Sequence, residues 1–351
     1  MFNYGHIKGF IMLSVLALIT QGCAVSSTNQ VTKPGEVKGG FMGLSKTAEV
    51  TVTQPKTLKN QSDKVIIGSF KVGFITEGKV KAVAKGGMFS GSIHQGKATA
   101  RVNLVGMTDE LMKKIANDAY QQMVQELQTA GYTVLAADEL TGQPEYAALQ
   151  AAGETGPQKE IPVNLLGGGK VDYVAPDGMN VIYFVGEKKV AFLSSMDTYN
   201  LAADLSEATG ANVLSVNYIV NFANAETHGG FKMTAGVKVG QGLSLVSGSS
   251  IGFYKGKKAF AGALALGQPV YSEKEFATIE KVTSKVEKAV GTAVNMASAL
   301  LGGGTSQSEE YNFNVVPEQF TAGAVEITTK TNHKLVAKLA EYRMATVAAQ
   351  L

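Results

Sequence analysis

Cysteine is nearly absent from this sequence, since Cys23 is the only one among 351 residues. A single thiol excludes an intramolecular disulfide framework. Because Cys23 directly follows an apolar segment near the N-terminus, four roles remain open for it. It could be a nucleophile, a metal ligand, half of an intermolecular disulfide or an attachment point, and the surrounding residues have to decide among these.

Histidine is also scarce, and the common motifs of metal and nucleotide sites are missing. His94, His228 and His333 lie far apart in the sequence, and none belongs to a metal-ligand pattern such as H-E-x-x-H. The glycine-rich segments 153–160 and 165–170 lack the spacing of a phosphate-binding loop. We therefore predict no metal site, no nucleotide site and no cofactor.

One short motif matches a hydrolase signature. The segment "GSSIG", residues 248–252, fits the G-x-S-x-G nucleophile elbow, which requires a strand that turns directly into a helix. Strand-like sequence flanks the motif on both sides, so we expect Ser250 to lie in a hairpin. The sequence thus predicts a protein that is not an enzyme and has no catalytic residues, with a periplasmic enzyme of unrecognised type as an alternative.

Neither sign of charge dominates the chain. Lysine and arginine together number 32, aspartate and glutamate 29, and the formal net charge is +3. This balance favours no particular class of partner. Any electrostatic recognition must therefore come from a local cluster of charges.

The N-terminal segment has the layout of an export signal. One cation, Lys8, precedes an apolar run over residues 10–19, and small and polar residues follow up to Gly22. A bilayer-spanning helix needs about 20 apolar residues, so this run is too short to cross a membrane. We predict that residues 1–22 form a signal peptide.

The end of this signal resembles that of bacterial lipoproteins, in which the cysteine sulfur is diacylated and the cysteine becomes the new N-terminus. Thr20 and Gln21 depart from the usual aliphatic and small residues, but Gly22 and Cys23 fit. Several acyl chains, such as palmitate, anchor a protein stably where one chain binds only marginally. We expect Cys23 to be lipidated and, because Ala24 follows it, the protein to reach the outer membrane; the alternative is a soluble periplasmic or secreted protein.

The remaining chain divides into a polar segment and a longer ordered part. Residues 23–62 are rich in small and polar residues and predict a lipidated tether with one short strand at 48–53. Residues 63–351 alternate strand-like and helical patterns, which predicts a single α/β (α+β) domain with a mixed β-sheet and covering helices. Glycine accounts for 40 of the 351 residues, or about 11%, against a usual share of about 7%. This excess suggests several hairpins.

The individual elements follow from periodicity and caps. A helix at 108–130 has Thr108 as its N-cap, and its apolar stripe is Leu111, Ile115, Ala119, Met123 and Leu127. Strands are expected at 64–76, 132–137 and 212–224, hairpins at 180–195 and 242–267, two short strands after residue 301, and further helices at 198–209, 273–301 and 333–349.

The helix expected at 273–301 carries a heptad seam, in which apolar residues are spaced alternately by three and four. An amphipathic helix that packs on its own sheet explains this pattern, and so does a surface for self-association or for docking of a partner helix. The seam consists of Ile279, Val282, Val286, Ala289, Ala293, Met296 and Leu300.

A ribbon at 78–104 has a basic face. Side chains of a strand alternate between faces, so small apolar residues share one side of this predicted hairpin and cations share the other. Such a face attracts anionic lipid, lipopolysaccharide or an acidic protein, unless it is only a solvated outer surface. The arms are too short to suit membrane insertion. The cations are Lys79, Lys81, Lys85, Lys97 and Arg101.

The order of these features resembles the periplasmic domain of the curli secretion channel family of bacterial outer-membrane lipoproteins. The resemblance covers residues 64–270 and includes the segments at 113–140 and 208–226. It implies an oligomeric outer-membrane secretion pore, but the helix expected at 273–301 replaces a membrane-spanning hairpin of that family. We therefore expect a lipoprotein whose periplasmic domain binds envelope or secreted components in an assembly or secretion apparatus, with the pore as the alternative; no nucleic acid partner is expected.

Overall fold

The computed structural model describes residues 23–39, 45–84, 96–137, 139–140, 142–163, 168–184, 187, 192–229, 235–256, 261–282 and 306–348. Within these residues, four helices accompany a 14-stranded sheet of mixed parallel and antiparallel pairs and a separate two-stranded pair. The α+β class predicted from the sequence is confirmed. The predicted signal peptide lies outside the described residues.

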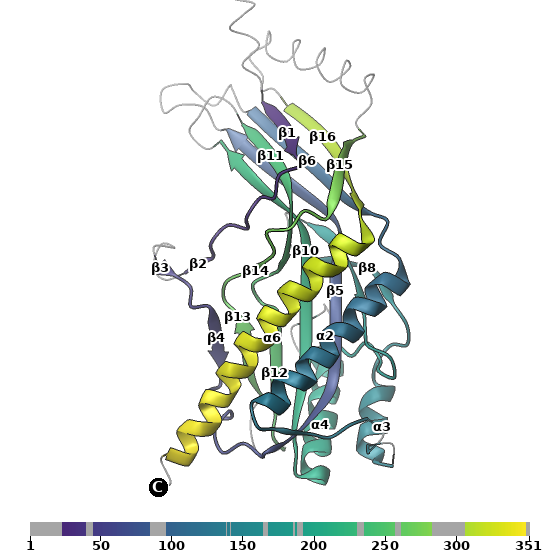
Figure 1. Ribbon diagram of the computed structural model, residues 1–351, viewed down its shortest axis with the longest axis vertical. Helices are drawn as coiled ribbons and strands as arrows, with labels where there is room; N and C mark the ends of the chain where they lie inside the picture. Colours follow the sequence, from purple (N-terminus) through teal and green to yellow (C-terminus); the bar gives the residue numbers. More distant parts are fainter. Residues whose placement is uncertain are drawn as a thin grey trace, which may run out of the picture.

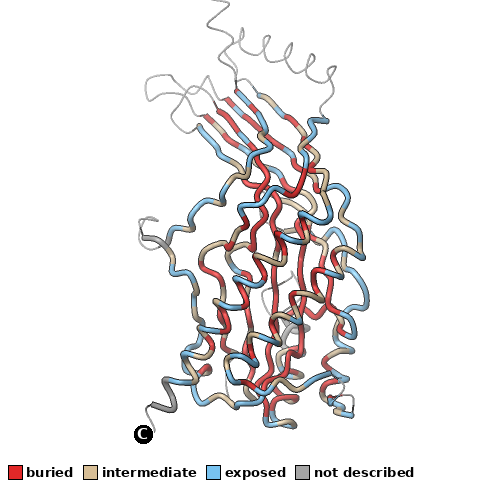
Figure 2. Tube along the Cα trace, in the orientation of Figure 1, coloured by how far each residue is buried: buried red, intermediate tan, exposed pale blue. Residues whose placement is uncertain are grey.

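The main sheet is built around two long strands that run parallel to each other. Its order is β15 (Ala277–Lys281), β16 (Ser306–Val315), β6 (Gly96–Val105), β5 (Lys64–Ala84), β10 (Asn212–His228), β12 (Ser250–Tyr254), β13 (Gly262–Leu266) and β4 (Val50–Thr53). The first eleven residues after Lys64 in β5 are buried, as expected for a central strand that is covered on both faces. Figure 2 shows this continuous buried path along the central strands.

Shorter strands extend the sheet at its edges. They are β1 (Ala24–Thr28), β7 (Thr133–Val134), β8 (Gln158–Val163), β9 (Gly169–Val174), β11 (Gly236–Leu245) and β14 (Val270–Tyr271), while β2 (Lys38–Gly39) pairs with β3 (Ser45–Lys46). β11 and β12 both pair with β10, β12 along its first half and β11 along its second half. At the end of the molecule beyond the helices, β1, β6, β11, β15 and β16 gather into what we call the strand bundle (Figure 1).

Helices cover both faces of the sheet. α2 (Asp109–Thr129) and α6 (Pro317–Ala348) pack against each other on one face, and α3 (Pro144–Ala151) and α4 (Phe192–Thr209) pack together behind the sheet (Figure 1). Each pair closes its own apolar cluster with the sheet. None of the helices in the described part of the chain carries an apolar stretch long enough to cross a membrane.

The helix at 108–130 forms as its sequence predicts. The hydroxyl of Thr108 accepts a hydrogen bond from the backbone N–H of Leu111 at 3.2 Å, which is the expected N-cap. At the other end Gly131 adopts a φ of +83°, and the N–H of Tyr132 donates to the carbonyl of Leu127 at 3.0 Å. This left-handed C-terminal turn favours glycine and closes the helix. Four of the five stripe residues are buried, and Leu111 is half-buried.

Two other helix and hairpin predictions need correction. α6 begins at Pro317, well before the expected residue 333. The described residues of the hairpin expected at 180–195 form no strand pair with each other: Val181 makes only an isolated bridge with Glu154, and α4 already begins at Phe192. The strand at 212–224 is confirmed, as β10, and the strand at 64–76 is confirmed within the longer β5.

The helix expected at 273–301 is wrong over residues 273–282. Residues 277–281 are β15, which pairs antiparallel with β16 from Ala277 opposite Val315 to Lys281 opposite Tyr311. The buried amide of Gln241 holds the start of this strand, because its Oε1 accepts from the N–H groups of Phe276 and Ala277 at 2.8 and 3.0 Å. Backbone pairing therefore overrides the helical pattern here. Residues 283–301 lie outside the described part.

The predicted tether is also wrong in the described residues between 23 and 62. β1 pairs in parallel with β11, from Ala24 opposite Gly236 to Thr28 opposite Gly240. The N–H of Thr32 donates to the carbonyl of Gln241 at 2.7 Å, and Leu58 is completely buried. The segment is held mainly through backbone groups, so its polar composition gave no sign of order. The short strand expected at 48–53 is confirmed as β4.

Candidate functional site

Cys23 lies at the open end of the strand bundle. It directly precedes β1, and the N–H of Ala24 donates to the carbonyl of Ala235 at 3.0 Å. A side-chain carbon placed on Gly96, at the start of β6, would come within 2.8 Å of the Cys23 sulfur. The cysteine is 8% exposed. The predicted lipidation residue therefore touches the first residue of β6 and lies beside the start of β11.

The hairpin formed by β5 and β6 carries its cations on one face. Directly opposed residues in an antiparallel pair project to the same side of the sheet. The apolar side packs inside the strand bundle, where Ala82, Ala98 and Ala100 are buried, so it is not available to lipid in this structure. Lys85 lies outside the described residues. The pairs on the basic side are Lys79 with Arg101, Lys81 with Thr99 and Val83 with Lys97.

All four described cations of this face are exposed, and their surroundings change along the hairpin. Towards the body of the molecule, Glu310 of β16 stands opposite Arg101, and Lys170 forms an ion pair with Glu77 at 2.8 Å. Towards Cys23, the residue of β16 opposite Lys97 is Ser306, which carries no charge. Positive charge is therefore least compensated by neighbouring strands at the end where Cys23 lies. Anion binding at this face stays a prediction.

The interior of the strand bundle contains a buried acid that the sequence did not reveal. Glu309 of β16 is 2% exposed and forms an ion pair with Lys281 of β15 at 2.7 Å. Gln307 donates to the other carboxylate oxygen at 2.9 Å. Burial and then the charge of Glu309 raise the pKa of Tyr311 to about 12, so its hydroxyl keeps its proton at neutral pH.

The predicted association seam is not helical in the two of its residues that the structure describes. Ile279 belongs to β15 and lies opposite Phe313, and Val282 directly follows that strand with 39% of its surface exposed. The other five seam residues lie outside the described part: Val286, Ala289, Ala293, Met296 and Leu300.

The G-x-S-x-G segment does not form a nucleophile elbow. Ser250 is the first residue of β12 and lies opposite Asn217 of β10, so a strand follows it rather than a helix. The expected hairpin is only partly correct. β12 pairs with β13, whereas β11 and β12 do not pair with each other and follow one another along β10.

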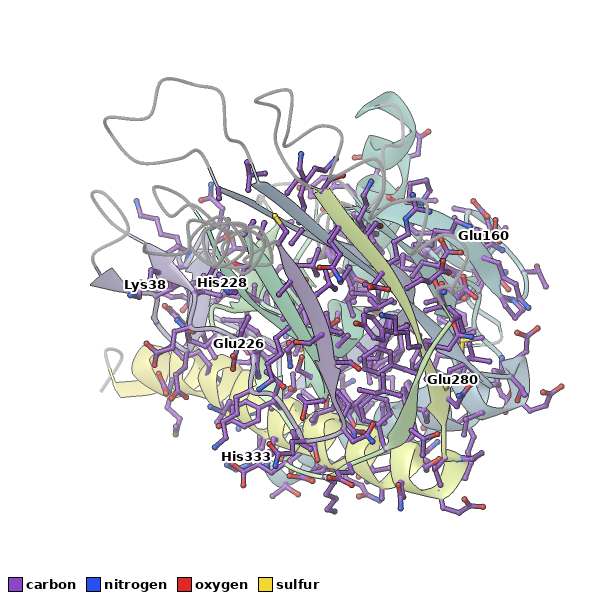
Figure 3. All side chains as sticks on the ribbon, turned by 90° about the horizontal axis from the view of Figure 1, so that it is seen from above. Lys38, Glu160, Glu226, His228, Glu280 and His333 are labelled. Carbon is purple, nitrogen blue, oxygen red and sulfur yellow. The ribbon has the colours of Figure 1, made fainter. Side chains whose placement is uncertain are left out.

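The described histidines lie apart and form no ligand cluster. His228 ends β10, His333 lies on α6, and Figure 3 shows them well separated; His94 is not among the described residues. His333 contacts Glu126 at 3.3 Å. In the residues that the structure describes, no group of three or more histidine, cysteine, aspartate or glutamate side chains could hold a metal ion.

Sequence reasoning missed a buried ion pair in the sheet. Lys71 of β5 is completely buried, and its Nζ donates to Glu187 Oε2 at 2.6 Å and to the carbonyl of Ile182 at 2.9 Å. The ammonium group also lies 5.7 Å from the centroid of the Tyr183 ring. A lone lysine inside the apolar strand "VIIGSFKVGFI" was the available signal. This pair adjoins a pocket on the face of the sheet where α4 lies.

Comparison with known proteins found no family model, no curated protein and no solved structure that matches this chain.

Proposed function

We propose that this protein is a non-enzymatic bacterial envelope lipoprotein, anchored in the outer membrane through Cys23, whose α+β domain binds envelope or secreted components. The observation that carries the proposal is the position of Cys23 beside Gly96, one residue before Lys97 of the basic face. An acyl anchor and a cluster of cations at the same end of the molecule suit an anionic membrane surface. Several weak signals of this kind together give stable membrane attachment.

The distribution of charge supports this orientation. Each lysine or arginine near an anionic surface contributes about 1 kcal/mol of attraction, and this attraction falls off within a Debye length. Lys81 and Lys97 lie in the outer half of the hairpin, away from the acids that border its inner half. The basic face would therefore meet phosphate groups of lipid, while the helices and the rest of the sheet extend away into the periplasm.

Mass spectrometry of the mature N-terminus tests the anchor. The expected result is a chain that begins at Cys23 and carries the mass of its acyl groups, together with loss of membrane fractionation in Cys23→Ser. An unmodified N-terminus in the wild type would contradict the proposal. So would acyl groups retained by the Cys23→Ser variant.

Vesicle flotation tests the basic face. The triple variant Lys79→Glu, Lys81→Glu and Lys97→Glu is expected to bind phosphatidylglycerol vesicles at least about tenfold more weakly than the wild type in low salt, because three attractions become repulsions. Both proteins carry Cys23→Ser, so that only the protein surface is measured. The wild-type surface should lose its binding as ionic strength rises.

A matched control variant replaces three exposed lysines by glutamate at and just before the start of β5, namely Lys56, Lys59 and Lys64. This control has the same net charge as the triple variant and is expected to keep vesicle binding close to that of the wild-type surface. Equal losses in the two variants would mean that net charge alone decides binding. Release of an encapsulated dye by the lipidated protein would instead favour the oligomeric pore.

A further inference from the structure

A pocket of about 420 Å³ lies on the sheet face where α4 packs, away from the strand bundle. Its floor comes from β10, β12 and β13, and its wall from Tyr199 of α4 and from Phe184 and Glu187, which precede that helix. The polar and aromatic residues that line it include Glu187, Tyr199, Ser215, Asn217, Ser250 and Tyr254.

The floor of this pocket is unusually polar for the middle of a sheet. Central strands covered on both faces are normally apolar. Here Ser215 lies opposite Gly252, Asn217 lies opposite Ser250, and on the other side Asn217 lies opposite the buried Lys71. Opposed residues project to the same face, so hydroxyl and amide groups from neighbouring strands are brought together at one place.

One of these polar groups lacks a partner. Asn217 is 6% exposed, and its Oδ1 accepts no hydrogen bond in the described structure. A buried acceptor without a donor costs about 1–3 kcal/mol, so native proteins rarely leave one unsatisfied without a reason. Asn217 lines the pocket, although its Oδ1 has almost no exposed surface, so a rotation of the side chain would present this acceptor to a donor on a ligand.

A glycine makes room for two hydroxyl groups at this floor. A side-chain carbon on Gly252 would come within 2.6 Å of the Ser215 hydroxyl oxygen and 3.1 Å of the Tyr254 hydroxyl oxygen. Such distances are too short for ordinary contacts, so even alanine would displace the two hydroxyl groups. The absence of a side chain at Gly252 is therefore part of the shape of the pocket.

Aromatic rings form the other side. The ring of Tyr254 lies 5.1 Å from that of Phe184 and 5.9 Å from that of Tyr199, measured between centroids. Burial raises the pKa of Tyr254, against the opposing effect of its hydrogen bond with Ser215, so its hydroxyl stays protonated well above neutral pH. The pocket thus offers apolar ring faces next to groups that both donate and accept hydrogen bonds.

The charge of the pocket is balanced. Glu187 is its one acid among the described lining residues, and Lys71 Nζ neutralises it from 2.6 Å away. The hydrogen bonds from Lys71 and from the N–H of Phe184 both go to Oε2. No lysine, arginine or histidine lines the described part of the pocket, which disfavours an anionic ligand. A cationic ligand is disfavoured as well, because Glu187 is already paired with Lys71.

We propose that this pocket binds a neutral polyhydroxylated ligand, about one to two sugar rings in size. Hydroxyl groups of a sugar can donate to Asn217 Oδ1 and Glu187 and accept from the serine hydroxyls, while its C–H faces pack on the tyrosine rings. The volume lies within the range of about 300–1,000 Å³ that small-molecule sites occupy. This inference goes beyond the proposed function and does not depend on the anchor or the basic face.

Saturation-transfer NMR and calorimetry on the full mature chain in detergent test the proposal. The neutral probes are glucose, galactose, N-acetylglucosamine, maltose and lactose, and the charged counterparts are glucose 6-phosphate and glucosamine. Saturable binding of at least one neutral probe, stronger than that of either charged counterpart, is expected. Failure of all five neutral sugars at millimolar concentration would overturn the proposal, as would a preference for a charged probe.

Two variants locate the binding. Asn217→Leu removes the acceptor and keeps the number of side-chain heavy atoms. It should weaken sugar binding at least about tenfold, while the folding stability is largely kept because the Asn217 Oδ1 accepts no protein hydrogen bond. Gly252→Ala should weaken binding by displacing the hydroxyl groups of Ser215 and Tyr254. Gly142→Ala, at a glycine with open space around it, is the matched control and should bind as the wild type does. Unchanged affinity in Asn217→Leu would place the sugar elsewhere and overturn the proposal.

Discussion

A lysine in the middle of a buried strand loses its hydration, and Lys71 recovers that loss through its contacts with Glu187 and the carbonyl of Ile182. Removal of one partner from a buried ion pair costs more than the pair itself contributes, because the remaining charge is left without compensation. The side chain of Glu187 is 14% exposed, so water can replace it only in part. At the scale of single residues, this pair is the most sensitive point of the sheet.

We expect Glu187→Ala to lower the free energy of unfolding by about 3 kcal/mol, since it leaves the Lys71 ammonium buried and unpaired. The double variant Lys71→Met with Glu187→Ala should recover most of this loss, because no charge then remains in the sheet. Urea denaturation at neutral pH measures both values. A double variant less stable than Glu187→Ala would show that the lysine stabilises the fold without its partner.

Among the elements, α6 is fixed to the sheet partly through a charged side chain. Glu326 accepts from the buried hydroxyl of Ser272 at 2.9 Å and from Lys330 at 2.7 Å, and Lys274 lies 3.5 Å away. Burial alone would raise the pKa of Glu326, but its hydrogen bonds with Lys330 and Ser272 together hold that pKa below its ordinary value. The carboxylate form is therefore the one that the folded protein prefers.

The stability that Glu326 contributes should consequently depend on pH. A carboxyl whose pKa is lowered on folding stabilises the protein above its ordinary pKa of 4.5, and the contribution is lost as the pH falls through the folded-state value. Glu326→Gln should therefore be less stable than the wild type at pH 7, by less than about 1 kcal/mol because the group is partly exposed. The difference should shrink in acid.

Thermal unfolding at a series of pH values measures this difference. Glu318→Gln, in the first turn of the same helix, is a control without an ion pair among the described contacts. A difference between Glu326→Gln and the wild type that stays constant between pH 7 and pH 3 would mean that packing, and not the charge, is responsible.

At the scale of the whole molecule, Gln241 joins segments that are far apart in the sequence. Its side-chain amide donates to the carbonyl of Asn29, and its Oε1 accepts from Phe276 and Ala277. The side chain of Asn29 in turn accepts from the N–H of Ile279 at 3.2 Å. The N-terminal segment, β11 and the start of β15 therefore meet at one completely buried glutamine.

Gln241→Leu should loosen the N-terminal segment and the start of β15 together. The variant leaves at least two backbone N–H groups and one carbonyl without partners, at a cost of about 1–3 kcal/mol each if they stay buried. Hydrogen exchange by mass spectrometry should show faster exchange in residues 24–32 and in residues 276–281. Gln121→Leu, on the exposed side of α2, controls for the added leucine and should leave both segments protected. Exchange that rises in only one segment would show that the two are held independently.

Sequence reasoning succeeded where local signals and packing agree. The cap at Thr108 and the stripe from Ile115 to Leu127 specify α2 without help from the rest of the chain. It failed for residues 277–281 and 24–28, where pairing with distant strands decides the structure and side-chain periodicity carries little information. The residues that share the basic face could be predicted, because side chains of a strand alternate between its two faces. The pocket could not be predicted, because Asn217 and Gly252 come together only through the register of the sheet, and Glu187 comes from a segment that pairs with neither strand.

The parallel pairing of β1 with β11 has a mechanical consequence for a load applied at Cys23. A flexible chain of about forty residues has a relaxed end-to-end distance of roughly 35 Å. A pull could draw it out to roughly 130 Å before much force reached the domain. Here the first paired residue is Ala24, so there is no slack between Cys23 and the sheet. A pull along β1 loads its hydrogen bonds with β11 in shear, all at once rather than one after another. The strand bundle is thus built as a stiff coupling that transmits displacement directly between its end and the body of the protein.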